Sequence, residues 1–168
     1  MSIDNYLIQY NDIKDKSIRD FLDLLEGTEG KRLKELSVQD LSYHNDKEIW
    51  PGTGVYLFRL NKKVMYVGKV SSMSFTERIP KHFDIRLYAW MNRLLKLLSE
   101  KHLPHDPVDD VNLVRASRYA FEKLNVVLIN FQEGDINRIE RLLRSCTGAL
   151  NSFRQLVERD LEKRVSDY

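Results

Sequence analysis

The sequence contains little cysteine and little histidine, and it has no long apolar run. Its single cysteine, Cys146, cannot form a disulfide within the chain, and together with four histidines it shows no spacing typical of zinc ligands. No apolar run approaches the ~18 residues that a membrane span needs, and residues 1–10 lack the features of a signal peptide. These absences argue against a structural zinc ion and predict a soluble cytoplasmic protein without membrane contact.

The chain also lacks a large excess of positive or negative charge. Lysine and arginine number 27 against 25 aspartate and glutamate, which gives a net charge of +2. This balance permits a nucleic-acid partner but does not predict one, because dedicated nucleic-acid binders are usually more basic. With 168 residues, 42% of them hydrophobic, the chain suits one compact domain or a core with a small extension.

The N-terminal part carries helix signals. Ser17 and Asp20 form a capping pair before a short apolar stripe, and Gly27 suits the end of that helix. Ser37 begins a weaker pair of the same kind. We therefore expect residues 1–50 to form a helical N-terminal extension.

A turn-forming run, Trp50-Pro51-Gly52-Thr53-Gly54, precedes two runs rich in β-branched and aromatic residues. Residues 55–60 and 64–69 predict a β-hairpin with a three-residue loop. In that register Tyr56 lies opposite Gly68 and Tyr66 opposite Phe58, so that both tyrosines share one face of the sheet. A loop one residue shorter would place the two tyrosines on opposite faces.

The rest of the chain alternates helical and extended patterns. We expect a helix over 85–103 closed by Pro104 and Pro107, a second over 109–123, a strand over 126–131, a helix over 136–146 ended by Gly148, and a helix-prone tail from 152.

Glu140 occupies a distinctive position on the helix expected at 136–146. At about 100° per residue it falls at the edge of the apolar stripe, where a carboxylate could offer an oxygen ligand to a hard divalent cation. The plainer interpretation is a surface ion pair with Arg144 four residues later, worth about 0.3–0.5 kcal/mol. The tyrosines likewise are first of all good strand residues, and Arg78 and His82 could form an exposed helix face.

Five segments in order resemble the GIY-YIG nuclease superfamily. They are Gly54-Val55-Tyr56, Tyr66-Val67-Gly68-Lys69, Phe75-Thr76-Glu77-Arg78 leading to His82, the strand at 126–131, and Glu140-Arg141-Leu142-Leu143 ending in Gly148-Ala149-Leu150-Asn151. The two short strand motifs alone would be weak evidence, but five elements in order are more specific.

The resemblance implies an α/β fold, in which a small three-stranded antiparallel sheet is flanked by helices. It covers residues 51–151 as a nuclease core, and within this core residues 84–123 would be a helical insertion. The core follows the helical N-terminal extension (1–50) and precedes a C-terminal helical tail (152–168). The insertion makes this chain longer than the smallest family members. Pro80 is a second departure, because it disfavours helical geometry at Ile79 and leaves the placing of His82 open.

The resemblance also implies an activity, the hydrolysis of phosphodiester bonds in DNA with one Mg²⁺ or Mn²⁺ ion. Tyr56 would be the general base, with Tyr66 beside it to orient water or phosphate. Glu140 would be the single protein ligand to the metal. The remaining roles would fall to Arg78 as an electrostatic clamp on phosphate, to Lys69 and His82 as phosphate contacts or proton donors, and to Asn151 in fastening the loop after the Glu140 helix.

Two other interpretations stay open. The same fold could be a binding module for nucleic acid or protein without cutting, which the modest net charge favours and the complete motif opposes. The motif could also be a coincidence in an unrelated small α/β protein. If the chain does cut both strands of DNA, its single site would require a homodimer or two successive nicks.

Overall fold

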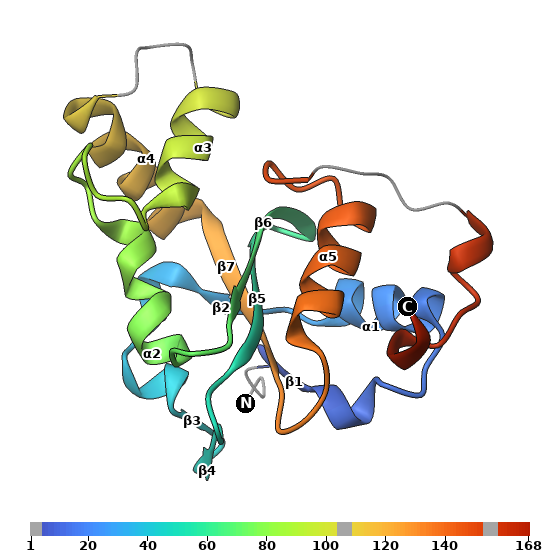
Figure 1. Cartoon of the computed structure of the whole chain (residues 1–168). Coiled ribbons are helices and arrows are strands. Elements are labelled where there is room, and N and C mark those ends of the chain that lie inside the picture. Colours follow the sequence, from blue (N-terminus) through green and yellow to red (C-terminus); the bar gives the residue numbers. More distant parts are fainter. Residues whose placement is uncertain (1–4, 104–108, 153–157) are drawn as a thin grey trace.

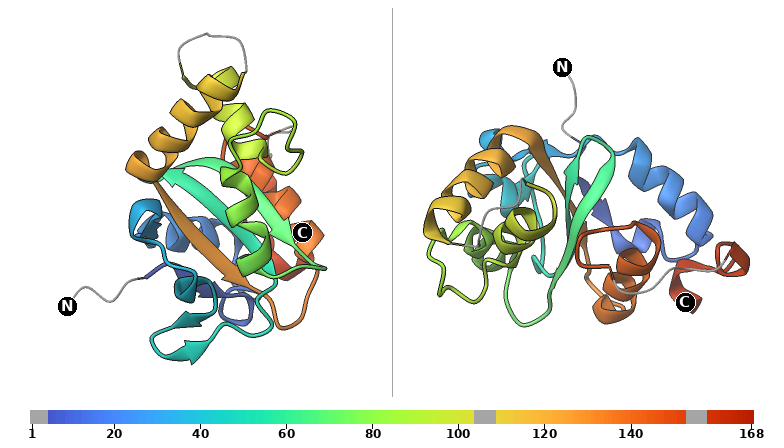
Figure 2. Two further views of the ribbon diagram at one scale, coloured as in Figure 1. Left: turned by 90° about the vertical axis from the view of Figure 1, so that its left-hand side faces the viewer. Right: turned by 90° about the horizontal axis from the view of Figure 1, so that it is seen from above.

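The protein, described here from a computed structural model over residues 5–103, 109–152 and 158–168, has a mixed α/β fold. A five-stranded sheet lies between two layers of helices (Figures 1 and 2). The order across the sheet is β1 (Leu7–Gln9), β7 (Leu124–Asn130), β5 (Gly54–Leu60) and β6 (Lys63–Val70), and β2 (Lys31–Arg32) also pairs with β7. A separate two-stranded hairpin pairs β3 (Tyr43–His44) with β4 (Lys47–Glu48).

The prediction of a three-stranded antiparallel sheet was wrong. The three expected strands do pair antiparallel, as β7, β5 and β6, but the N-terminal segment adds β1 parallel to β7 and β2 antiparallel to it. The expectation that residues 1–50 form a helical extension describes only part of that segment, because its strands β1 and β2 belong to the main sheet. Strand β1 has only three residues, and it pairs with residues far away in the sequence, Leu7 with Leu128. No local sequence pattern therefore predicts it.

The hairpin of β5 and β6, which carries Tyr56 and Tyr66, has the predicted register near the tyrosines but a different loop. Its loop has two residues, Asn61 and Lys62, not the expected three, and Asn61 takes the left-handed backbone conformation that asparagine tolerates. A β-bulge compensates, since Phe58 pairs with Tyr66 while Arg59 pairs with Val64, and Met65 is the extra residue. Beyond the bulge the register is the predicted one, which puts the two tyrosines on the same face.

Helices cover both faces of the sheet, as the view from above in Figure 2 makes clear. One face packs against α2 (Phe75–Arg78), the 3-10 turn η4 (Pro80–Phe83), α3 (Arg93–Lys101) and α4 (Asp110–Lys123). The other packs against α1 (Ile18–Gly27) and α5 (Ile136–Cys146). Strand β5 serves both cores by alternation, because Tyr56 and Phe58 face the first and Val55 and Leu57 the second.

The helix predictions were confirmed where a capping residue marks the start. Ser17, Asp109 and Asp135 each accept a hydrogen bond from a backbone N–H of the first turn of α1, α4 and α5. The prediction for 85–103 was wrong in its first half, since α3 begins at Arg93, and Pro104 and Pro107 lie outside the described residues. After Ser37 a helix was expected, and the structure has the short 3-10 turn η3 (Gln39–Leu41). A helical tail was also expected, and its described residues, which exclude 153–157, contain the 3-10 turns η5 (Glu158–Asp160) and η6 (Val165–Asp167).

Across the described ranges, no helix combines the length and the apolar character needed to cross a membrane.

Candidate active site

The tyrosine pair stands on the face of the sheet that α2, η4 and α3 cover. The two rings lie with their centroids 6.5 Å apart. Gly68, opposite Tyr56, makes this arrangement possible: a Cβ atom there would lie 2.2 Å from Cζ of Tyr56 and 2.3 Å from its hydroxyl oxygen. The glycine of the second strand motif is therefore required by the ring across from it.

The segment after β6 brings Arg78 and His82 to the same face. Ser74 and Glu77 form a capping box and start α2. The expectation that Pro80 would disturb Ile79 was wrong, because Ile79 is helical and Pro80 occupies the first position of η4, where a missing N–H costs nothing. Arg78 then donates from Nη1 to the backbone oxygen of Met91 at 3.0 Å.

His82 is fully buried and its ring contacts both tyrosines. Its Nε2 lies 2.6 Å from the Tyr56 hydroxyl, and its Nδ1 accepts the backbone N–H of Leu94 at 3.3 Å. Burial, with a smaller contribution from Arg78, lowers the pKa of His82 well below its usual value, so the ring is neutral. A neutral ring that accepts at Nδ1 carries its proton on Nε2, which makes His82 the donor to Tyr56.

Both tyrosine hydroxyls resist ionisation, but not equally. Burial is the largest influence on each and raises the pKa of Tyr56 and of Tyr66. At Tyr56 the neighbouring Tyr66 adds to this increase, and Arg78 is the cation that opposes it. At Tyr66 three cations oppose the increase, Arg78, Arg144 and Arg93. Tyr66 also keeps 6% of its surface exposed, whereas Tyr56 keeps none.

Glu140 lies on α5, across β6 from the tyrosines. Its carboxylate is largely buried, with 10% of the side chain exposed. Oε1 accepts from Nη1 of Arg144 at 3.2 Å, and Oε2 lies 3.7 Å from Nζ of Lys69, which also donates to Oδ1 of Asn137 at 2.6 Å. The pair with Arg144 expected from the four-residue spacing is thus present, and Lys69 adds a second cation.

Asn151 fastens the segment after α5 to the outer edge of β6. Its side chain accepts from the backbone N–H of Val67 at 3.1 Å and donates to the Val67 oxygen at 2.6 Å, as a neighbouring strand would. Arg144 holds the same segment by donating from Nε to the Asn151 oxygen at 2.9 Å. Asn151 therefore fixes the position of α5, and with it Glu140, against β6.

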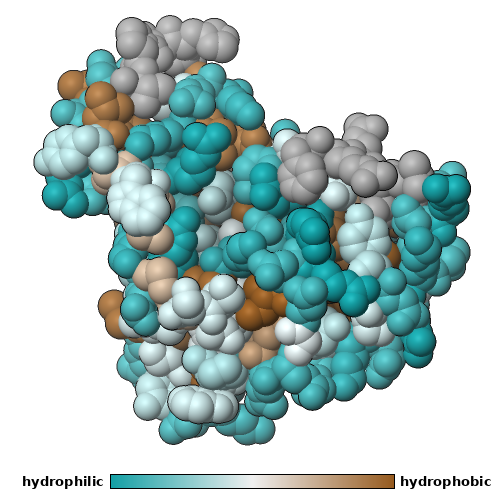
Figure 3. Space-filling view, viewed as in Figure 1, coloured by the Kyte–Doolittle hydropathy of each residue, from teal (hydrophilic) through white to brown (hydrophobic). Residues whose placement is uncertain are grey.

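The seven predicted residues form two groups on the two sides of β6. One contains Tyr56, Tyr66, Arg78 and His82, and the other Lys69, Glu140 and Asn151. The groups are within electrostatic reach, because Glu140 raises the pKa of both tyrosines and Arg144 lowers that of Tyr66. In Figure 3 the surface between the helices on either side of β6 is mainly hydrophilic.

Two members of this neighbourhood were missed from the sequence. Arg144 was considered only as a surface partner of Glu140, although it also contacts Asn151. Arg93 was hidden inside a helix expected to run from 85, whereas it is the first residue of α3. The four-residue spacing could have pointed to Arg144; nothing in the local sequence marks Arg93.

The residues present would suit only a metal ion with a single protein ligand. In the described part of the chain, no three His, Cys, Asp or Glu side chains gather as a metal site. Glu140 offers one carboxylate, and the side chain of Lys69 beside it is 40% exposed. Mg²⁺ commonly keeps several waters and binds one or two carboxylates together with substrate phosphates, so Glu140 fits a single-ligand site completed by substrate.

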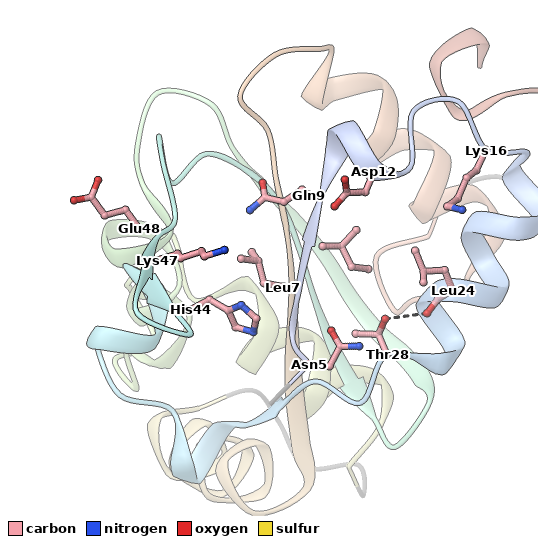
Figure 4. A pocket seen from close by; sticks show the side chains of 11 residues that line it. Asn5, Leu7, Gln9, Asp12, Lys16, Leu24, Thr28, His44, Lys47 and Glu48 are labelled. Atoms are coloured by element: carbon pink, nitrogen blue, oxygen red, sulfur yellow. Dashed lines mark hydrogen bonds between the residues drawn. The ribbon is translucent and has the colours of Figure 1, made fainter. Parts of the chain in front are cut away.

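A pocket of about 460 Å³ lies elsewhere, along β1, and contains none of the seven predicted residues. Figure 4 shows Leu24 of α1 and Thr28, which directly follows α1, on one side of it, and Lys47 and Glu48 of β4 on the other. Its lining mixes apolar side chains with charges of both signs, and it suggests no chemistry.

Comparison with known proteins adds no relative: no protein-family model, curated protein or solved structure matches the chain.

Proposed function

We propose that this protein is a divalent-metal-dependent endonuclease that hydrolyses phosphodiester bonds in DNA. The observation that carries the proposal is the gathering of residues from five separate segments around β6. They combine a tyrosine pair, a buried histidine, arginines and a carboxylate. The resemblance of these segments to the GIY-YIG nucleases, in order and spacing, supports the same activity, with Mg²⁺ or Mn²⁺ held by Glu140.

The cations would bind and polarise the scissile phosphate. Arg78 presents a guanidinium that stays charged at any working pH, and its fork of donors matches phosphate oxygens. Lys69 and Arg144 already neutralise Glu140, so each is positioned to turn towards a phosphate when substrate arrives. A bound Mg²⁺ or Mn²⁺ would supply further positive charge as charge builds on the phosphate oxygens.

Tyr66 is better placed than Tyr56 to act on the attacking water. A tyrosine accepts a proton only as the phenolate, and its unperturbed pKa is about 10. Three arginines favour that phenolate at Tyr66, against one at Tyr56, and only Tyr66 keeps some exposure. We therefore assign the general-base role to Tyr66, in place of the Tyr56 expected from the sequence.

Tyr56 and His82 become positioning residues in this scheme. His82 is fully buried, so a direct phosphate contact, which the sequence interpretation allowed, is not open to it. Its Nε2–H holds the Tyr56 hydroxyl, and its ring also packs edge-on against Tyr66 with centroids 4.9 Å apart. The histidine would thereby fix the direction of both phenol rings.

The proposal is tested by incubating the purified chain with supercoiled plasmid and Mg²⁺ or Mn²⁺. We expect nicking that EDTA abolishes, and a loss of about 100-fold or more in Arg78→Ala and Glu140→Ala, typical of removing an electrostatic contact to the transition state. Tyr66→Phe should lose more activity than Tyr56→Phe. Arg19→Ala and Glu26→Ala, exposed residues of α1, are the matched controls and should cut like the wild type.

The nuclease proposal fails if the wild-type chain nicks plasmid no faster than Arg78→Ala and Glu140→Ala over several DNA forms. A larger loss in Tyr56→Phe than in Tyr66→Phe would return the base role to Tyr56.

A binding module is the second candidate, and one observation favours it. The Glu140 carboxylate already contacts two cations, Lys69 and Arg144, which is also how a purely structural ion pair would look. In that case DNA would bind in a salt-sensitive manner without being cut, and Glu140→Ala would leave the binding unchanged.

A further inference from the structure

Residues 84–92, which we call the aromatic loop, expose large side chains next to the candidate active site. Trp90 is 85% exposed and Tyr88 79%, and Ile85 and Leu87 are also exposed. Scattered exposed apolar residues are ordinary on a protein surface, but four within six positions form a patch of the kind that binds a partner. In Figure 1 the loop stands out between η4 and α3.

Hydrogen bonds hold the loop, so its exposed rings are presented on a fixed frame. The buried Asn92 donates from Nδ2 to the backbone oxygens of Asp84 at 2.6 Å and Arg86 at 3.0 Å. Lys96 of α3 donates to the oxygen of Ala89 at 2.5 Å, and the N–H of Leu87 donates to the Asp110 carboxylate at 2.6 Å. The sequence interpretation as helix fails here because Asn92 closes these residues into a loop.

The loop is also tied directly to candidate active-site residues. Arg78 donates to the backbone oxygen of Met91, the neighbour of Trp90, and His82 accepts the N–H of Leu94. The backbone of the aromatic loop is therefore joined to Arg78, the residue proposed to bind the scissile phosphate.

Positive charge concentrates around the same segment. The stretch 78–101 holds six basic and two acidic residues, a surplus of four, whereas the whole chain has a net charge of +2. The basic residues are Arg78, Lys81, Arg86, Arg93, Lys96 and Lys101. Arg86, which pairs with the Asp84 carboxylate at 2.5 Å, also lies over the ring of Tyr88, with its guanidinium carbon 5.5 Å from the ring centre. Exposed aromatic rings set among cations match a strand with anionic phosphates and flat bases.

We propose that the aromatic loop binds unpaired bases of the DNA substrate, with Trp90 and Tyr88 stacking on the bases and the surrounding cations contacting the phosphates. The inference rests on the proposed function, because it names the substrate class of that site. In an intact duplex each base face is covered by its neighbours. Single strands, flaps, gaps and frayed ends leave faces free for aromatic side chains. The preferred substrate is therefore DNA with a single-stranded part beside the cut.

Binding is measured without cutting, in EDTA, with the full chain. The probes are a single-stranded oligothymidylate and a blunt duplex of equal length, each carrying a fluorescent label for anisotropy. We expect Trp90→Ala and Tyr88→Ala each to weaken binding of the single strand about tenfold or more, as loss of one stacked base predicts, and to change duplex binding far less. Trp50→Ala removes a 70% exposed tryptophan outside the loop and should bind like the wild type.

Intrinsic fluorescence gives an independent measurement. The chain has two tryptophans, so Trp50→Phe leaves Trp90 as the sole tryptophan. Stacking on thymine should quench its emission, and a far-ultraviolet circular dichroism spectrum like that of the wild type would show that the fold is intact.

The inference is overturned if Trp90→Ala binds the single strand as tightly as the wild type, or loses duplex binding to the same extent. It is also overturned if Trp90 emission responds to phosphatidylglycerol vesicles and not to DNA, which would make the loop a membrane contact. Loop-dependent DNA binding without plasmid cutting would refute the nuclease and keep the loop proposal. Plasmid cutting with full binding by Trp90→Ala would do the reverse.

Discussion

At the residue scale, the absence of a side chain at Gly68 leaves the space that the Tyr56 ring occupies. A Cβ at this residue would come within 2.6 Å of two ring carbons and the hydroxyl oxygen of Tyr56, a side chain that is fully buried. We expect Gly68→Ala to lower the free energy of unfolding by about 1–3 kcal/mol, as overpacking of a core does, measured by urea denaturation.

The control for this substitution is Gly27→Ala. A Cβ at Gly27 meets nothing within 4 Å, and the residue lies at the end of α1 in a helical conformation. Alanine there should leave the protein as stable as the wild type or slightly more stable. A Gly68→Ala variant that unfolds at the wild-type urea concentration would show that Tyr56 can give way, and that the glycine is not needed for the ring.

At the element scale, the buried Arg59 joins β5 to the end of α1. Its guanidinium, 1% exposed, donates to the backbone oxygens of Leu25, Thr28 and Glu29, so a cation meets the carbonyl end of the helix where the dipole favours it. We expect Arg59→Met to lose about 1–3 kcal/mol of stability, because the Thr28 oxygen loses its guanidinium donor, whereas the Leu25 and Glu29 oxygens still accept from the Thr28 N–H and from Nδ2 of Asn125. Hydrogen exchange should become faster in α1 than in α4.

The matched control is Arg19→Met on α1, where the arginine pairs with Glu162 and is 49% exposed. Exposed pairs contribute up to about 1 kcal/mol, so this variant should unfold close to the wild type. Equal losses in the two arginine variants would contradict a special role for the buried guanidinium.

The elements that the sequence predicted are those with local signals. Capping side chains at Ser17, Asp109 and Asp135 mark three helices, and runs of β-branched and aromatic residues mark the strands of the hairpin. The aromatic loop shows where such signals mislead: its apolar spacing imitates a helix, but the hydrogen bonds of Asn92 to Asp84 and Arg86 decide its path. A single side chain reaching over eight residues leaves no periodic pattern to read.

At the scale of the whole molecule, the candidate site depends on contacts that no local pattern contains. The position of Glu140 beside β6 follows from its helical spacing together with the Asn151 contact to Val67, 84 residues away in sequence. The face of each tyrosine was predicted correctly only because the bulge at Met65 offsets the shorter loop. The parallel strand β1 joins residues more than a hundred positions apart, which explains why the sheet was underestimated.

The described part of the chain contains one copy of the candidate site, and this number determines how the protein would cut a duplex. The outer edge of β6 is occupied by the chain itself, since Leu150 donates to the Met65 oxygen and Asn151 pairs with Val67. A second copy therefore cannot extend the sheet there to bring two sites together. We expect a monomer of 19.9 kDa that converts supercoiled plasmid to the nicked circle first and to the linear form only through a later, independent nick. Gel analysis of a time course, with the solution mass measured by light scattering, checks this order; linear DNA that appears without a nicked precursor, together with twice the chain mass, would show a dimer with paired sites.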